Sequence, residues 1–477
     1  MKYYLIPLLV LSFLSKSSYE QTCNCEKNFQ WVKKTFEIND AGYLKTIELK
    51  GKQTYISHTS SYMQKIKSAK TITECASVIN EWIKFFRKGH IGVFPADDQD
   101  KNDTDTHWEK ANIDLQSFKN YLHSKKIPDF EGIWTVDDYR IGVIKQKNRY
   151  IGFIIESGNI SWKQNQIKLK FTKSNDGDKL IYYTGNKSSE EYKTVELIGN
   201  NYLQAGGYIL KRELPEFEKD NKQIEDYYKI MTAKQPYAEM LNDKTVYLRI
   251  PSFNLKYKKT IDSVIIEYKS KILTTENLII DLLDNGGGGD DSYQELLPFL
   301  YTNPFRNIAT AHRSTKLNNQ TIIDNANNPD YGYSAEEKRM AKQSYDKLES
   351  QLGKFVNLGT NIIEIEKRDT IYPYPKNVGI IINEHNGSTT EQFLLAAKQS
   401  KKVKLFGRTT FGALDMSNLS IVKSPSNDLV LVYATSRSFR ISEMPIDDIG
   451  IQPDYYLDKG IPLFKWVEFV NETLNMK

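Results

Sequence analysis

Ser388 is the residue whose position most clearly suggests chemistry. Val378 to Ile382 is continuously apolar, which is typical of a strand buried on both faces, and Thr390 to Ser400 has apolar residues at helical spacing. Ser388 is therefore expected on the turn between them, beside helix N-terminal amides that could stabilise an oxyanion. A helix cap is the more frequent use of such a residue, and Ser388 with Glu391 also has the spacing of a capping box.

A run of glycines, Gly286 to Gly289, follows a second apolar strand, Leu278 to Leu283. Consecutive glycines carry an entropic cost, so they are expected where the backbone must approach a ligand closely and present free amides. A phosphate-binding loop is the rival interpretation. The sequence around these glycines contains neither GKS or GKT nor GxGxxG, so that rival is weak.

Four motifs occur in a fixed order: DLLDNGGGG at Asp281 to Gly289, GSTTE at Gly387 to Glu391, GRTTFGA at Gly407 to Ala413 and GIQPD at Gly450 to Asp454. Together they resemble the carboxy-terminal processing and tricorn-like serine peptidases, the tail-specific protease family. The resemblance covers Lys244 to Asp454 and implies a crotonase-like spiral of strands and helices, hydrolysis of a protein or peptide substrate with Ser388 as nucleophile, and no cofactor or metal.

The general base differs between the two branches of this family. In the processing branch it is a lysine at the position that Ala413 occupies here, so a Ser-Lys pair is not available. The tricorn-like branch uses a histidine from before the core, and FFRKGHIGVF around His90 resembles that element, with Gly89 expected to stop the preceding helix. Without the resemblance, a single histidine beside an apolar helix is more often a core or capping residue. His385, in the same turn as Ser388, is the alternative base.

A histidine base needs an acid that holds its tautomer. The family's late acid lies just before the GIQPD motif, and Asp447 matches that position most closely. Asp448 and Glu443 remain alternatives, because an exposed acidic loop would have the same pattern. The resemblance thus predicts a Ser-His-acid arrangement of Ser388, His90 and Asp447.

Backbone amides of Gly287 or Gly288, together with the amide of Thr389, are expected to stabilise the oxyanion. The loss of the lysine at Ala413 keeps a second hypothesis open. In it, the chain is a non-catalytic binding protein of the same fold, which uses the cleft or a β domain for a peptide or a hydrophobic ligand.

The first residues predict export. Met1 to Leu14 has one lysine followed by an apolar run that is shorter than the about 20 residues of a membrane span. Residues 1–21 are therefore expected to be a signal peptide of a secreted or periplasmic protein, with no stable membrane span after its removal. The three cysteines leave room for one disulfide, and Cys23 or Cys25 with Cys75 is one possibility.

The chain of 477 residues is long enough for two or three domains. Residues 22–105 are expected to form a helical region that carries His90, residues 106–215 an inserted antiparallel sheet or barrel, and residues 216–477 the peptidase core. The expected fold class is therefore α/β with a helical N-terminal region and a β insertion. The net charge of +5 forms no basic stripe, which argues against nucleic acid as a partner, and the sequence does not specify an oligomeric state.

Overall fold

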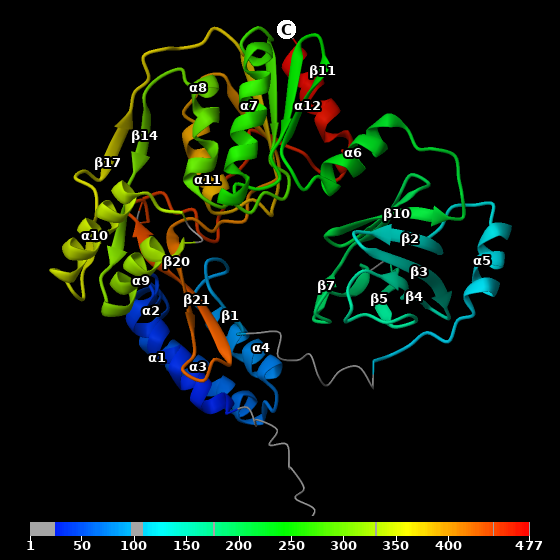
Figure 1. Cartoon of the computed structure of the whole chain (residues 1–477), viewed down its shortest axis with the longest axis horizontal. Helices are drawn as coiled ribbons and strands as arrows, with labels where there is room; N and C mark the ends of the chain where they lie inside the picture. Colours follow the sequence, from blue (N-terminus) through cyan, green and yellow to red (C-terminus); the bar gives the residue numbers. More distant parts are fainter. Residues whose placement is uncertain (1–23, 97–107, 175–176, 330–331, 442, 477) are drawn as a thin grey trace, which may run out of the picture.

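The computed structural model describes residues 24–96, 108–174, 177–329, 332–441 and 443–476. The expected signal peptide and Cys23 lie outside the described residues. The described chain forms a set of N-terminal helices, a nine-stranded β domain and a larger core of strands and helices (Figure 1). The expected α/β fold class is confirmed, while the domain boundaries stay predictions.

A six-stranded sheet forms the centre of the core. The edge strand β11 is antiparallel to its neighbour and the other strands are parallel. Every residue of β12 and β13 is buried, as expected for strands covered on both faces. In sheet order the strands are β11 (Tyr237–Asn242), β12 (Thr245–Arg249), β13 (Asn277–Asp281), β18 (Asn377–Ile382), β19 (Val403–Gly407) and β22 (Tyr455–Tyr456).

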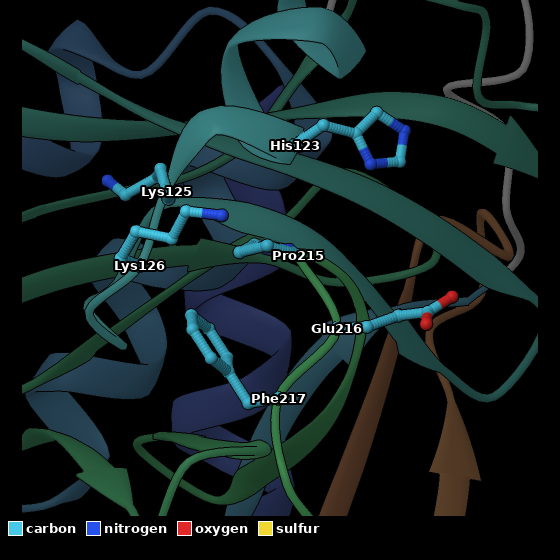
Figure 2. Close-up of a pocket in the computed structure, with 6 residues that line it drawn as sticks. All are labelled: His123, Lys125, Lys126, Pro215, Glu216 and Phe217. Carbon is cyan, nitrogen blue, oxygen red and sulfur yellow. The ribbon is translucent and has the colours of Figure 1, made fainter.

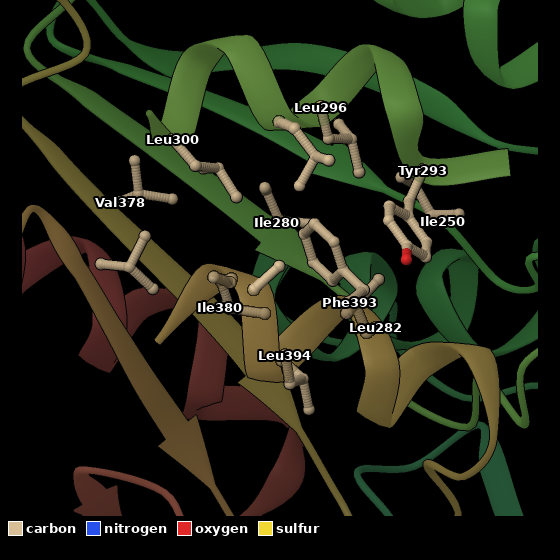
Figure 3. Close-up of a cluster of buried hydrophobic side chains, with 14 of the residues drawn as sticks. Ile250, Ile280, Leu282, Tyr293, Leu296, Leu300, Val378, Ile380, Phe393 and Leu394 are labelled. Atoms are coloured by element: carbon tan, nitrogen blue, oxygen red, sulfur yellow. The ribbon is translucent and has the colours of Figure 1, made fainter. Parts of the chain in front are cut away.

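Alternation of side chains along these strands divides the core into two apolar layers. Ile280 and Ile380 pack on one face against helices, as Figure 3 shows. Ile279 and Ile381 pack on the other face against Trp466. The first face is covered by α7 (Lys258–Ile272), α8 (Leu297–Leu300) and α11 (Thr389–Ala397), and the second by α12 (Trp466–Asn475).

A five-stranded antiparallel sheet supports the N-terminal helices. Leu429 and Leu431 of its central strand share a buried cluster with Phe29 and Trp82 of the helices. β1 and β20 pair with opposite edges of β21, since Val432 lies opposite both Gly92 and Ile421. The elements are α1 (Cys25–Asn39), α2 (Tyr43–Lys50), α3 (Lys52–Ser68), α4 (Ile72–Ile83), β1 (Gly92–Pro95), β15 (Thr310–Arg313), β16 (Phe355–Asn357), β20 (Met416–Lys423) and β21 (Leu429–Ser438).

A disulfide joins Cys25 of α1 to Cys75 of α4, which is one of the two expected pairings. The sequence separation of 50 residues closes a long loop in the unfolded chain. We therefore expect replacement of both cysteines by serine to lower the free energy of unfolding by about 4 kcal/mol. Urea denaturation of the double variant and the native protein, both without reductant, measures this loss. An unchanged midpoint would show that packing alone holds α1 to α4.

The chain between β13 and β18 includes two smaller substructures. One is a pair of helices, α9 (Lys316–Asn327) and α10 (Ala335–Glu349), which pack against each other. The other is a two-stranded antiparallel ribbon of β14 (Phe305–Ile308) and β17 (Ile363–Glu366). Figure 1 shows both at the side of the core that lies away from the β domain.

The β domain is one antiparallel sheet with apolar side chains on both faces. One face buries Trp134, Phe171 and Tyr182, and α5 (Leu115–Ser124) covers the other through Phe118. α6 (Lys222–Thr232) packs on β10 and leads into the core. In sheet order the strands are β7 (Ser189–Tyr192), β6 (Lys179–Tyr183), β5 (Ile167–Thr172), β4 (Arg149–Ser157), β3 (Tyr139–Gln146), β2 (Gly132–Val136), β10 (Tyr208–Leu214), β9 (Tyr202–Ala205) and β8 (Val195–Ile198).

Candidate active site

The turns that follow β13 and β18 meet at one edge of the core sheet, because these strands are parallel neighbours. Asn386 donates from Nδ2 to the carbonyl of Asn285 at 3.0 Å, and the Thr390 hydroxyl donates to the same carbonyl at 2.9 Å. These bonds join the glycine loop to the turn that carries Ser388. The structure therefore brings together the two motifs that the sequence placed at strand ends.

Ser388 occupies a strained turn, with φ of 56° and ψ of −127°. Backbone of this kind costs about 1–3 kcal/mol and is concentrated at functional sites. The Ser388 amide donates to the carbonyl of Ala413 at 2.9 Å. Its hydroxyl caps no helix amide and has no hydrogen-bond partner among the described residues. The nucleophile candidate therefore has a free Oγ.

The capping interpretation of Ser388 and Glu391 is wrong. The buried carboxylate of Glu391 accepts the amides of Gly412 and Ala413 instead, each at 2.8 Å. Since Ala413 in turn holds the Ser388 amide, Glu391 fixes the loop on which the turn rests. The serine-x-x-glutamate spacing thus reflects support for the nucleophile's backbone.

Gly287 does not supply an oxyanion donor, which corrects the sequence prediction. Its amide already donates to Oδ1 of Asn285 at 3.0 Å. Gly287 has φ of 103°, and a side chain on it would come within 2.8 Å of Cβ of Ser388. This glycine therefore allows the loop to approach the nucleophile without offering it an N–H group.

Gly288 and Thr389 carry the free amides. Gly288 lies opposite Phe253. The Phe253 amide donates to the Gly287 carbonyl, and the Gly289 amide donates to the Phe253 carbonyl. Neither bond uses the N–H of Gly288, which has no acceptor among the described residues. The Thr389 amide is the first of α11 and likewise has no acceptor in the described chain. Two unpaired N–H groups beside Ser388 form an arrangement that can stabilise an oxyanion.

His90 lies in the loop between α4 and β1, with φ of 56°. α4 ends at Ile83, so Gly89 is not the helix stop that the sequence suggested. Arg87 fixes the loop instead, because it donates to the carbonyls of Gly89 at 3.1 Å and His90 at 2.9 Å. The guanidinium of Arg87 is held by a buried ion pair with Asp40 at 2.6 Å.

The ring of His90 is bonded in a way that suits a general base. Its Nδ1 lies at hydrogen-bond distance from the carbonyl of Met416. A carbonyl can only accept, so Nδ1 carries the proton and Nε2 is left as an acceptor, which has no partner among the described residues. Burial of the ring, opposed by the Met416 bond, lowers the pKa of His90. The ring is therefore neutral at neutral pH.

Ala413 links the loops of Ser388 and His90. Its carbonyl accepts the Ser388 amide, and a methyl group on Gly89 would lie 2.4 Å from its Cβ. No hydrogen bond joins Ser388 to His90 directly in the described structure. Catalytic hydrogen bonds are often long in substrate-free sites, so this geometry is compatible with a proton transfer that forms only with substrate bound.

Asp447 lies near His90 without touching it. Its Oδ1 accepts the amides of Leu414 and Asp415, each at 2.6 Å, and its Oδ2 accepts the amide of Met416 at 3.2 Å. Burial, with the charge of Asp415, raises the pKa of Asp447 to about 6. No hydrogen bond connects Asp447 to His90 in the described chain. The direct contact expected of a triad acid is therefore absent, and Asp447 reaches the histidine only through the Met416 peptide.

The other acid candidates are more peripheral. The side chain of Asp448 is half exposed and faces Lys88 at 4.0 Å. Glu443 is exposed on the surface. Neither forms a hydrogen bond with His90 among the described residues, so of the three candidates only Asp447 is tied to the loop that bonds the ring.

Unlike His90, His385 is paired with a carboxylate, in the turn that carries the nucleophile. Its Nδ1 lies 2.9 Å from Oδ1 of Asp284, which also accepts from Asn383 at 2.7 Å. The hydrogen bond to Asp284 raises the pKa of His385. Its side chain is 60% exposed, whereas His90 is only partly exposed. His385 therefore favours the imidazolium form more strongly than His90 does.

Sequence reasoning missed two groups at this site. The carbonyl of Met416 is a backbone atom and has no signature in a residue pattern. Asp284 could have been found, because it lies inside the DLLDNGGGG motif, but its partner is 101 residues further along the chain. Both contacts depend on the fold bringing distant segments together.

A cavity of about 280 Å³ lies at the end of α5, and Figure 2 shows the side chains that line it. Lys125 in this cavity is paired with Asp129 at 2.5 Å and Glu131 at 2.6 Å. Three of the lining residues are charged and one is a histidine, so the cavity does not suit the hydrophobic ligand considered for the β domain. The lining residues are His123, Lys125, Lys126, Pro215, Glu216 and Phe217.

Comparison with known proteins gives one family and a set of similar structures. Residues 244–457 match the sequence model of peptidase family S41. The structure of mature CPAF complexed with lactacystin has a TM-score of 0.50 and 13% identity, over 94% of this chain and 97% of that chain. Comparison with curated proteins finds no match.

Two other solved structures are similar over most of this chain. The photosystem II D1 C-terminal processing protease has 10% identity and a TM-score of 0.40, over 95% of this chain and 98% of that chain. The tricorn protease has 9% identity and a TM-score of 0.42, over 95% of this chain and 36% of that chain. The family match covers every motif of the site except the loop of His90. Residues 244–457 are therefore a peptidase domain of family S41, a family of serine-type peptidases.

Proposed function

We propose that this chain is an exported peptidase that cleaves peptide bonds with Ser388 as nucleophile and His90 as general base. The observation that carries the proposal is the free Oγ of Ser388 beside two unpaired amides, with a half-buried histidine of fixed tautomer on the adjoining loop. A serine hydroxyl is a weak nucleophile without a base, and the position of the lysine in the processing branch is Ala413. His90 supplies the missing group.

The proposed reaction follows from these positions. The Oγ of Ser388 attacks the scissile carbonyl while Nε2 of His90 takes its proton. The amides of Gly288 and Thr389 donate to the resulting oxyanion. His90 then gives its proton to the leaving amine, which breaks the C–N bond and leaves an acyl group on Ser388. Water, deprotonated by His90, releases the acid product and restores the serine.

Asp447 acts in this proposal as a positioning residue. Its carboxylate holds three consecutive amides, the last of which belongs to Met416, and the Met416 carbonyl holds His90. We expect Asp447→Asn to lower kcat by about 10- to 100-fold, short of the ~10⁴ seen when an acid bonded directly to the base becomes an amide. Steady-state kinetics with circular dichroism measures this. A loss near 10⁴ in a folded variant would mean that Asp447 contacts His90 during turnover.

Export is the second part of the proposal. The disulfide between Cys25 and Cys75 fits an oxidising compartment, which is where such bonds persist. None of the described helices combines the length and apolar content needed to cross a bilayer. Expression of the full chain in a bacterial host, followed by cell fractionation and mass spectrometry of the N-terminus, tests the proposal. Recovery of the uncleaved chain in the cytoplasm would overturn it.

The peptidase proposal itself is tested by incubating the folded chain with a mixture of unstructured peptides and with a fluorophosphonate probe. Cleavage together with labelling of Ser388 is the expected result. A folded protein that neither cleaves nor reacts would favour the binding-protein alternative over Ser-His chemistry.

A further inference from the structure

Phe411 is an aromatic residue whose ring lies close to the loops of both the nucleophile and the base. A methyl group on Gly387 would lie 3.9 Å from its Cδ1, and a methyl group on Gly89 would lie 3.0 Å from its Cε1. Gly387 directly precedes Ser388, and Gly89 directly precedes His90. Two adjacent atoms on one edge of the ring therefore face the two loops.

The rest of the ring is open to solvent. Phe411 is 41% exposed, although phenylalanine is among the residues that are most often buried. Single exposed apolar residues are common, so this exposure is informative only because of its place beside the two loops. Gly89, Gly387 and the nearby Ala413 carry no polar side-chain atom. The ring and its neighbours thus form an apolar surface next to the candidate site.

The backbone that carries the ring is held by hydrogen bonds. The Phe411 amide donates to the carbonyl of Asn386 at 2.8 Å. Oε1 of Glu391 accepts the Thr410 hydroxyl at 2.5 Å and the Gly412 amide at 2.8 Å. The position of Phe411 is thus set before a substrate binds, which reduces the entropy that an ordered contact would otherwise cost.

The proposed reaction determines which substrate residue comes near this ring. The oxygen of the scissile carbonyl lies at the amides of Gly288 and Thr389, and the leaving nitrogen takes its proton from His90. The residue that carries the leaving nitrogen must therefore lie toward the loop of His90, where the ring of Phe411 is.

We propose that Phe411 is a specificity-determining residue, whose ring binds an apolar side chain on the residue immediately after the scissile bond. An apolar side chain would bury its surface on the ring, whereas a charged one would lose water against an apolar surface. This inference rests on the proposed roles of Ser388 and His90, and it names the class of substrate that they would cleave.

Mass spectrometry of cleaved peptides gives the first test. The native chain is incubated with a mixture of unstructured peptides, and the residues on either side of each cleaved bond are counted against their frequency in the mixture. Leucine, methionine and phenylalanine should be enriched immediately after the cleaved bond. Phe411→Ala should lose this enrichment, because a methyl group offers little apolar surface.

Kinetics on matched peptides measures the size of the effect. Two peptides have the same sequence except for the residue after the cleaved bond, which is leucine in one and glycine in the other. Phe411→Ala should lower kcat/KM for the leucine peptide by about 10-fold and for the glycine peptide by less than about 2-fold. Phe411→Glu should favour lysine over leucine at this position, because its carboxylate attracts a cation. This variant keeps the inference testable if Phe411→Ala does not fold.

Phe94→Ala is the matched control. Phe94 is also an exposed phenylalanine and is close to His90 in the sequence, but its ring lies against Gly92 of β1. This variant should keep both the enrichment and the ratio of kcat/KM between the two peptides.

Several results would overturn the inference. These are a native chain without apolar enrichment after the cleaved bond, an equal loss on both peptides with Phe411→Ala, and a changed preference before the bond instead of after it. The same change of preference in Phe94→Ala would also contradict it. Failure of the proposed function is distinguishable, because in that case the native chain would cleave no peptide or Ser388→Ala would still cleave.

Discussion

Ser388→Ala should abolish peptide hydrolysis and leave the fold intact. Loss of a serine nucleophile costs about 10⁶ in kcat in a serine peptidase. The Ser388 hydroxyl makes no hydrogen bond among the described residues, and both serine and alanine must adopt the same strained φ of 56°. We therefore expect the free energy of unfolding to change by less than about 0.5 kcal/mol.

The measurement combines kinetics, urea denaturation and labelling with a fluorophosphonate. The native chain should be labelled at Ser388 and the variant should not. Ser263→Ala is a suitable control, since Ser263 is exposed on α7 and bonds only the carbonyl of Lys259 at 2.8 Å. A marked drop in stability with Ser388→Ala would show a structural role, and label remaining on the variant would point to another nucleophile.

The local part of this site could be predicted from the sequence. The apolar run before Ser388 forms β18, and the helical pattern after it forms α11, which begins at Thr389 and ends at Ala397. The glycine loop after β13 also lies where the motif placed it. These features depend on periodicity and on strand order, which short stretches of sequence contain.

The hydrogen-bond partners could not be predicted in the same way. Glu391 has the spacing of a capping residue, yet its carboxylate accepts amides 21 and 22 residues further on, because the loop folds back over α11. His90 and Met416 are 326 residues apart. Gly288, and not Gly287, offers a free N–H group, because Oδ1 of Asn285 accepts the N–H of Gly287. Such competition among nearby acceptors appears only in three dimensions.

The alanine at position 413, where the processing branch has a lysine, lies against the loop that carries His90. Gly89 approaches Ala413 so closely that a methyl group on the glycine would lie 2.4 Å from the alanine Cβ. A longer side chain at position 413 would compete for this space with the loop that carries His90. The small side chain at position 413 therefore leaves room for the loop that carries His90.

His90→Ala should lower kcat by about 10⁴- to 10⁶-fold while KM changes little, because the base acts in the chemical step. His385→Ala is the matched comparison, since it removes the other histidine near Ser388, and it should leave most of the activity. Adding Ala413→Lys to His90→Ala should not restore turnover, because the geometry of a lysine base is not built into this loop. Steady-state kinetics of these variants on one peptide measures all of these effects.

The pH profile identifies the base independently. A base must be neutral to accept a proton, and burial lowers the pKa of His90, so native kcat/KM should fall on acidification with an apparent pKa below 6.5. Asp447 has a pKa of about 6 and titrates in the same range, so the profile is repeated with Asp447→Asn, where the acid limb should persist. If His385 were the base, its hydrogen bond to Asp284 would give the acid limb of the kcat/KM profile an apparent pKa above 6.5. In that case His385→Ala would abolish activity and His90→Ala would not.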